Sequence, residues 1–412
     1  MKKEQGGAVL ALPMSDETGR RLPEGSMAAS LLMRLTRCVR LVVLLGAQVL
    51  VALALGACAT APAPLGIPTA VPRIEDAKKG HPVKVAVFYG TNRVPVARPV
   101  YFDDNEAAEV QYGYALVSLP WIHEKGEVET PTVFDWDRNN PDRFMLLLDA
   151  VPLRPDEFIA QVNRSFAADP RKNIGFVFVH GFNVPFRDAA LRTAQLAVDM
   201  QLPVVPAFFS WPSNGESPVE GTANYLRDFT KAISSIPALE EFLVQFGEKT
   251  RAEEIYVLAH SMGSWTTTHA LMSLALNRPK LAAKVKLVTL AAPDIDARVF
   301  TVQIAPAMVK AGYAVNLYAS DNDKALNASR VVWGRPRAGI AGAALTLSPG
   351  VETIDASDID TDVLGHSKYG DSPALLEDMA LFYGGARAGK RPGLIPRKRG
   401  AETYWQIQAP PH

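Results

Sequence analysis

The stretch VLAHSMGSWT (residues 257–266) places Ser261 directly after a short apolar run, with small residues two positions away on either side. Its central pentapeptide AHSMG matches the G-x-S-x-G pattern of a nucleophile elbow, except that Ala259 occupies the first glycine position. In such an elbow the serine sits on a strained turn between a strand and a helix, where bulky neighbours would collide with the backbone. The stretch therefore predicts a strand, a sharp turn at Ser261 and a helix behind it.

Serine is also a favoured N-cap residue, so Ser261 has an alternative, purely structural role at the start of the predicted helix. A cap does not require small residues at positions 259 and 263, so the spacing favours a nucleophile. In the helix that follows, larger side chains recur every three or four residues, and this face is expected to pack on a sheet. They are Met262, Trp265, His269, Met272 and Leu276.

Short apolar runs alternate with helix-like stretches on both sides of Ser261. Continuous apolar runs of this kind are typical of strands that are buried on both faces. The predicted strands cover residues 174–179, 204–209, 255–258, 285–290, 314–319 and 351–354, and helix-like stretches include 186–200 and 237–250. This alternation predicts the α/β class, with a mainly parallel central sheet and helices on both faces. The strand-like region 83–165 is expected to extend the same sheet.

A serine hydroxyl needs a base that takes its proton and an acid that orients the base. After an elbow of this type, the acid and then the histidine follow the serine along the chain. Only His366 and His412 lie beyond the next predicted strands, and His412 is the last residue of a proline-rich end. His366, in VLGHSKYG, is therefore the predicted base, and the alternative is a histidine in a surface loop.

The acid has three candidates, each in a loop that follows a predicted strand. Asp321 and Asp323 follow the strand 314–319, and Asp294 follows the strand 285–290. Each of them has an alternative role as a loop or N-cap aspartate. We expect Asp323 to be the acid, since the usual acid follows the second strand after the elbow, with Asp321 second and Asp294 third.

The oxyanion hole is expected to contain the backbone N–H of Met262 and a second N–H from an earlier loop. The stretch VFVHGFNVPF (177–186) turns at Gly181, so the N–H of Phe182 or Asn183 is the second candidate. His180 and His260 flank the predicted pocket. They are interpreted as hydrogen-bonded structural residues, because no spaced carboxylate or cysteine cluster accompanies them. No metal and no cofactor are therefore expected.

The first part of the chain resembles a secretory signal that ends in a lipobox. Three arginines precede the uncharged run LVVLLGAQVLVALALGAC, which ends at Cys58. Residues 1–57 are interpreted as the signal, with an over-extended start, and Cys58 as the lipidated residue of a protein anchored at the outer membrane and facing the periplasm. An uncleaved membrane anchor is the alternative.

Composition divides the rest of the chain. Residues 58–82 are rich in proline and alanine and are expected to form a tether, residues 83–385 the folded domain, and residues 386–412 a solvated basic tail. The formal net charge of the chain is zero, which argues against a protein that binds nucleic acid by neutralising phosphates. The oligomeric state is not predicted.

Six blocks of sequence occur in an order that resembles a bacterial α/β-hydrolase family of unknown function within the esterase/lipase superfamily. The blocks are FYGTNR, VHGFN, AHSMG, LAAPDID, YASDNDKAL and GHSKY, and the resemblance covers roughly residues 83–385. The resemblance implies an α/β-hydrolase fold, with Ser261, Asp323 and His366 at the matching catalytic positions. It implies little about the substrate, because the family is poorly characterised.

Three classes of function are compatible with these observations. The first is a serine hydrolase that cleaves a carboxylic ester, with a small-molecule or lipid ester reached from a membrane surface as its substrate. The second is a serine peptidase or amidase that uses the same three residues. The third is a non-catalytic binding lipoprotein that retains the fold, because fold does not imply function. A complete Ser/His/Asp set disfavours the third class.

Overall fold

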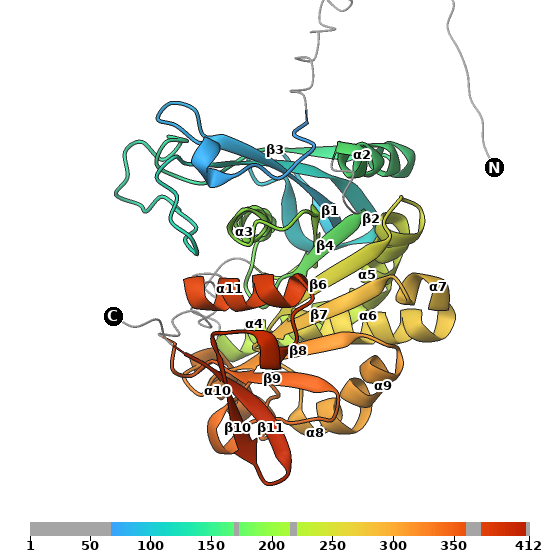
Figure 1. Ribbon diagram of the computed structural model, residues 1–412. Coiled ribbons are helices and arrows are strands. Elements are labelled where there is room, and N and C mark those ends of the chain that lie inside the picture. Colours follow the sequence, from blue (N-terminus) through green and yellow to red (C-terminus); the bar gives the residue numbers. More distant parts are fainter. Residues whose placement is uncertain (1–66, 169–172, 215–220, 360–371, 409–412) are drawn as a thin grey trace, which may run out of the picture. The chain divides into compact units, whose positions relative to one another are not determined.

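A single sheet runs through the computed structural model, which describes residues 67–168, 173–214, 221–359 and 372–408. Its strand order is β10-β11-β9-β8-β7-β6-β4-β5-β1-β2-β3. The strands are β1 (Val83–Pro95), β2 (Phe102–Leu119), β3 (Leu146–Leu153), β4 (Ile174–Val179), β5 (Val205–Ser210), β6 (Glu254–His260), β7 (Val285–Ala291), β8 (Ala314–Ala319), β9 (Val351–Asp355), β10 (Leu394–Arg399) and β11 (Glu402–Ile407). The sheet and its helices have the α/β-hydrolase fold that the sequence predicts (Figure 1).

The centre of the sheet is parallel and buried. Strands β5, β4, β6, β7, β8 and β9 pair in parallel, and every residue of β4 and β5 is buried. Each large apolar side chain buried in this way contributes about 1.5–3 kcal/mol relative to an exposed position. The region 83–165 extends this sheet as expected, since β1 pairs with β5 in parallel and β2 pairs with β1 and β3 in antiparallel fashion.

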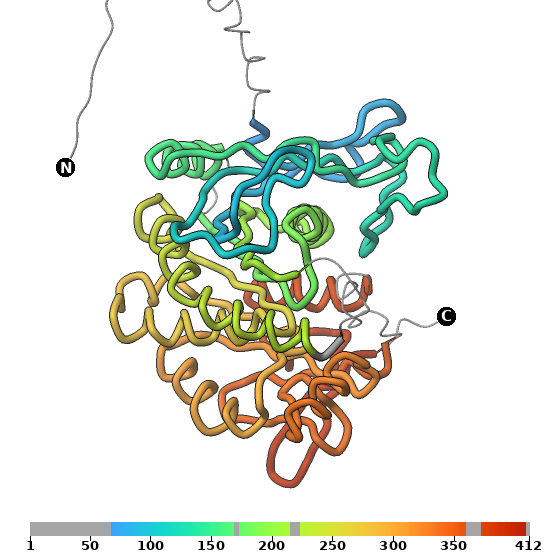
Figure 2. The backbone as a smooth tube through the Cα atoms, turned by 180° about the vertical axis from the view of Figure 1, so that it is seen from behind, coloured from blue at the N-terminus to red at the C-terminus, as the bar shows by residue number. Residues whose placement is uncertain are grey.

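Helices cover both faces of the sheet (Figures 1 and 2). They are α2 (Pro155–Ala168), α3 (Phe186–Asp199), α4 (Gly221–Ser234), α5 (Ile236–Leu243), α6 (Gly263–Asn277), α7 (Pro279–Ala282), α8 (Ala297–Val299), α9 (Ala305–Lys310), α10 (Lys324–Trp333) and α11 (Pro373–Tyr383). Leu191 of α3 and Met379 of α11 belong to one core layer, whereas Phe242 of α5 and Leu271 of α6 belong to the other. Within the described ranges, no helix combines the length and apolar character that crossing a bilayer needs.

The order of the central strands creates a switch point beside β6. From β4 the chain runs through α3 to β5 on one side, and it then returns to β6 on the other side of β4. Helices α3 and α5 therefore pack on opposite faces of the sheet. The carboxyl ends of β4 and β6 stand next to each other, with Val179 opposite Ala259. In open parallel sheets this is the place where ligands bind.

Helix α6 follows the predicted packing face only in part, since Met262 is buried and Trp265 and Met272 pack against the core. Ala270, Leu271 and Leu274 are buried, whereas Leu276 is 82% exposed. Trp265 also lies over the ring of His269, with 4.3 Å between ring centroids. The prediction followed the largest side chains, but the inward face of this helix is built largely from small residues that allow close approach.

The structure also corrects both ends of the predicted domain. Val71, Ile74 and Ala77 pack against the core, so residues 67–82 are not a free tether. The segment expected to be a solvated tail contributes β10 and β11, and β11 pairs in parallel with β9. The folded unit thus begins at Ile67 and includes the basic segment. Composition missed both contacts because proline-rich and basic stretches can dock through a few apolar side chains.

Candidate active site

Ser261 occupies the turn between β6 and α6 that the sequence predicts. Its backbone is left-handed, with φ of 48°, and the residue is 3% exposed. A residue other than glycine costs about 1–2 kcal/mol in this conformation. Neighbouring loops hold the turn in place, because the N–H of Ser261 donates to the carbonyl oxygen of Ala291 at 2.9 Å and its own carbonyl oxygen accepts from Asp294 at 3.1 Å.

Two glycines explain why small residues surround this turn. A Cβ atom on Gly263 would stand 2.2 Å from the carbonyl oxygen of His180, which is far inside contact distance. A Cβ atom on Gly181 would stand 3.0 Å from the Cβ of Ser261. The turns after β4 and β6 are thus pressed against each other. Ala259, which replaces the first glycine of the motif, is fully buried in the core without disturbing this contact.

The two predicted oxyanion donors lie on these adjacent turns. Met262 directly precedes α6, and its N–H donates to no acceptor among the described residues. Phe182 follows Gly181 on the other turn. Asn183 has a left-handed backbone with φ of 58°, and its N–H lies 3.5 Å from Oδ2 of Asp228. Asn183 thus has an acceptor in Asp228, and Phe182 stays the predicted second donor.

A buried arginine that sequence reasoning missed supports this loop. Arg93 is 1% exposed, and its guanidinium donates to the carbonyl oxygens of Val184 at 2.8 Å and Ser213 at 3.0 Å. It also donates to Oγ of Ser210 at 2.8 Å. Burial lowers the pKa of Arg93 to about 10, so it keeps its charge at neutral pH. The sequence feature that could have indicated this role is the position of Arg93 at the end of FYGTNR, directly after a buried strand segment.

His180 has the structural role that the sequence predicts. Its ring stacks on Trp211 with centroids 5.1 Å apart, and its Nε2 lies 3.1 Å from Oγ of Ser210. Burial and the charge of Arg93 lower its pKa to about 3, so the ring is neutral. Among the described residues, no cluster of three or more His, Cys, Asp or Glu side chains is placed to hold a metal ion.

The three candidate acids have different surroundings. Asp294 accepts from Tyr225 on one carboxylate oxygen at 2.7 Å. Its other oxygen accepts from Ser329 at 2.7 Å and from Nε of Arg337 at 2.6 Å. Both oxygens of Asp294 are therefore occupied by structural partners. Asp321 is exposed at the surface.

Asp323 is the candidate that is both buried and partly available. It is 2% exposed and caps α10 through Oδ1, which accepts from the N–H groups of Ala325 at 2.9 Å and Leu326 at 2.8 Å. Its Oδ2 accepts no hydrogen bond from the part of the chain that the structure describes. Burial raises the pKa of Asp323 to about 6, although the two backbone N–H groups oppose the shift.

Ser261 and Asp323 share the carboxyl edge of the sheet. Strands β6, β7 and β8 end in register there, with Ala259 opposite Leu290 and Leu290 opposite Leu317. His366 and Cys58 lie outside the described residues, so neither is placed. Before His366 in the chain, β9 also ends at this edge, beside β8. After His366, Ser372 caps α11.

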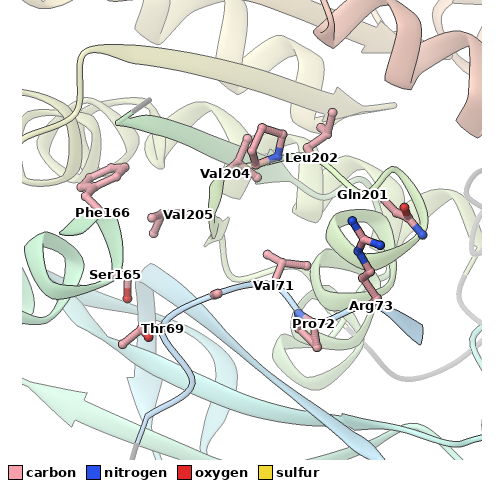
Figure 3. A pocket seen from close by; sticks show the side chains of 12 residues that line it. Thr69, Val71, Pro72, Arg73, Ser165, Phe166, Gln201, Leu202, Val204 and Val205 are labelled. Atoms are coloured by element: carbon pink, nitrogen blue, oxygen red, sulfur yellow. The ribbon is translucent and has the colours of Figure 1, made fainter. Parts of the chain in front are cut away.

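A cavity of about 200 Å³ lies elsewhere, at the opposite edge of the sheet (Figure 3). Its lining includes Val71, Phe166 of α2, and Val205, the first residue of β5. Because Ser261 follows the carboxyl end of a strand parallel to β5, this cavity is separate from the candidate active site.

The match to a protein-family model agrees with this fold. The family model described as "alpha/beta hydrolase of unknown function (DUF900)" matches residues 154–382. An uncharacterised protein from Nostoc sp. is 32% identical over 120 residues, a match that covers 23% of this chain and only 30% of that relative. A poly(3-hydroxybutyrate) depolymerase from Bordetella parapertussis is 14% identical with a TM-score of 0.32, covering 76% of this chain and 95% of its own. A carboxylesterase from a metagenomic library is 14% identical with a TM-score of 0.28, covering 58% and 99%. The family match covers more than half of the chain, which therefore belongs to this alpha/beta hydrolase family of unknown function.

Proposed function

We propose that the protein is a serine hydrolase that cleaves a carboxylic ester, with Ser261 as nucleophile, His366 as base and Asp323 as acid. The observation that carries this proposal is the left-handed turn of Ser261 at the switch point of the sheet. Such a turn is strained and is expected where function requires it. The close packing of Gly181 and Gly263 against it supports the same role.

The proposed reaction proceeds through an acyl-enzyme. Oγ of Ser261 attacks the carbonyl carbon of the ester while His366 takes its proton. The negative charge then forms on the former carbonyl oxygen, where the N–H groups of Met262 and Phe182 donate hydrogen bonds. His366 returns the proton to the departing alcohol, and the acyl group stays on Ser261. His366 then takes a proton from a water molecule, which attacks the acyl carbon. The bond to Oγ of Ser261 breaks, His366 returns the proton to Oγ, and the carboxylic acid leaves.

Asp323 acts through His366 in this scheme. Its carboxylate would accept from one ring nitrogen, hold the other toward Ser261 and stabilise the imidazolium. Oδ2 of Asp323, which accepts no hydrogen bond from the described residues, suits this contact, because Oδ1 is already committed to the cap of α10.

The nucleophile is tested by labelling with a fluorophosphonate probe and by ester hydrolysis. Ser261→Ala should lose labelling, with turnover falling by several orders of magnitude because only binding and the oxyanion hole remain. Ser264→Ala is the matched control, since Ser264 is fully buried one turn further along the same segment. Retained labelling of Ser261→Ala would contradict the assignment. A panel of nitrophenyl esters of graded chain length beside matched amides would distinguish an esterase from a peptidase or amidase.

We also propose that Cys58 is lipidated and attaches the protein to the membrane of the cell envelope. The supporting observation is the sequence LGAC at the end of an uncharged apolar run, with no later cysteine in the chain. Two or more acyl chains give the stable anchoring that one chain does not. Metabolic labelling with a fatty-acid analogue should label the native chain, whereas Cys58→Ser should stay unlabelled. An unlabelled native chain would contradict lipidation.

A further inference from the structure

The loop between β2 and β3 presents two aromatic rings to solvent. Phe134 and Trp136 are each 92% exposed, and Val133 beside them is 77% exposed. We name these three residues the aromatic tip. Contiguous exposed apolar side chains of this size mark contact surfaces in most soluble folds. Figures 1 and 2 show this segment, coloured teal, projecting from the sheet.

Hydrogen bonds hold the aromatic tip in this orientation. Asp135 and Asp137 alternate with the two rings, and both carboxylates bond to the guanidinium of Arg143, at 3.2 and 2.5 Å. Asp135 also accepts from the N–H and the hydroxyl of Thr132, each at 2.7 Å. The charged groups thus turn back to a cation of the same loop. The side chains that the aromatic tip exposes to solvent are therefore apolar.

The loop lies next to the point where the chain enters the domain. The N–H of Gly80 donates to the carboxylate of Asp142 at 2.9 Å, which joins the entering segment to the loop. Val71 and Ile74 of that segment pack on the same core layer as Val128 of the loop. The aromatic tip is therefore carried by the part of the domain that the N-terminal segment reaches first.

The length of chain before this point limits what the tip can meet. The eight residues 59–66 separate Cys58 and its apolar run from Ile67. Fully extended, they span at most about 30 Å. If the run or a lipid on Cys58 sits in a membrane, the entering segment stays within that distance of the surface.

We propose that the aromatic tip contacts the lipid surface itself, with Phe134 and Trp136 at the level of the headgroups. Aromatic rings are favoured at that depth because they combine an apolar body with a weakly polar edge. The loop 120–145 carries six acidic residues against three Lys or Arg residues and His123, so the matching surface is zwitterionic and not anionic. This inference rests on the proposal that the N-terminal segment is held at a membrane and is independent of ester hydrolysis.

The test uses the full chain reconstituted with phosphatidylcholine vesicles, part of whose lipid carries brominated acyl chains that quench tryptophan emission. Flotation reports attachment, and quenching reports contact. Wild-type emission should be quenched, and Trp136→Phe should remove most of the quenched component. Trp333→Phe is the matched control, because Trp333 is partly exposed on α10, outside the loop. It should leave the quenched component unchanged.

Flotation tests the membrane anchor, and quenching tests the contact of the aromatic tip. A chain that floats while Trp136 remains unquenched would overturn the contact and leave the anchor intact. A chain that does not float would overturn both. The double variant Phe134→Ser, Trp136→Ser should still float and hydrolyse a soluble ester like the wild type, because neither exposed ring supports the fold.

Discussion

Arg93 and Val184 lie 91 positions apart in the chain, yet the guanidinium of the first donates to the carbonyl oxygen of the second at 2.8 Å. Val184 belongs to the loop that carries Phe182, the proposed oxyanion donor. A charge at the end of β1 therefore holds the loop that follows β4. The strand and the loop meet because β1 is the second strand from β4 in the sheet, with β5 between them.

Arg93→Gln should weaken both the fold and catalysis. Each buried oxygen left without its partner costs about 1–3 kcal/mol, and the loop would no longer hold the N–H of Phe182 in place. We expect a lower unfolding midpoint in urea and a fall in kcat larger than the change in KM. Arg98→Gln is the control, because Arg98 pairs with Asp149 at the surface and is 67% exposed. Equal effects of the two variants would contradict a positioning role for Arg93.

Gly263→Ala should disturb the candidate active site through a steric clash alone. The added methyl would stand 2.2 Å from the carbonyl oxygen of His180, so the turns after β4 and β6 must separate. Overpacking of this kind typically costs about 1–3 kcal/mol. Thermal unfolding and ester turnover should both decrease. Gly393→Ala, where no atom lies within 4 Å of the added carbon, should change neither.

Replacing each of the three candidate acids by asparagine should have a different effect on stability and turnover. Asp323→Asn should keep the fold but lower turnover by about ten-thousand-fold, because the imidazole can adopt the wrong tautomer. Asp294→Asn should instead destabilise the protein by about 3–5 kcal/mol, since the buried charge of Arg337 loses its partner. Asp321→Asn, at an exposed position, should change little. Urea unfolding together with kcat separates these outcomes, and a stable Asp323→Asn variant with normal turnover would exclude Asp323 as the acid.

The hydrogen bonds of His123 lead us to expect that the folded protein loses stability at alkaline pH. Burial disfavours its charge, but hydrogen bonds with Asp199 and Glu129 outweigh burial and raise its pKa from 6.5 to about 9. Because the folded pKa is above the unfolded value, the contribution is full below pH 6.5 and is lost as the pH rises through about 9. The free energy of unfolding should therefore decline over this window. His123→Gln should flatten the decline, and an unchanged profile would refute the assignment.

The sequence predicted the centre of the fold well because burial on both faces leaves a clear local signal. The predicted strands 174–179 and 314–319 coincide with β4 and β8, and the others differ by one or two residues at one or both ends. The turn at Ser261 was predicted because its requirement for small neighbours is also local. The same reasoning was only partly right at α6, where Leu271, Leu274 and several small residues outside the predicted face are buried.

The choice among the acids depended on contacts that a linear pattern does not contain. Asp294 could be set aside only because Tyr225, Ser329 and Arg337 bind its carboxylate from 69, 35 and 43 positions away. Arg93 was missed for the same reason, since its acceptors follow other strands. The roles of Ser261, Asp323 and His366 remain predictions, and His366 lies outside the described residues.

The sequence of β10 disfavours pairing between this edge of the sheet and a strand of a second molecule. Strand β10 is the outermost strand on its side of the sheet, so one row of its backbone groups is open to pairing with another chain. Its sequence LIPRKR places Pro396, which has no N–H to offer, beside three consecutive cations at 397–399. A second molecule approaching this edge would meet like charge and a missing donor. Neutralising these cations should therefore promote edge-to-edge aggregation while leaving the candidate active site untouched.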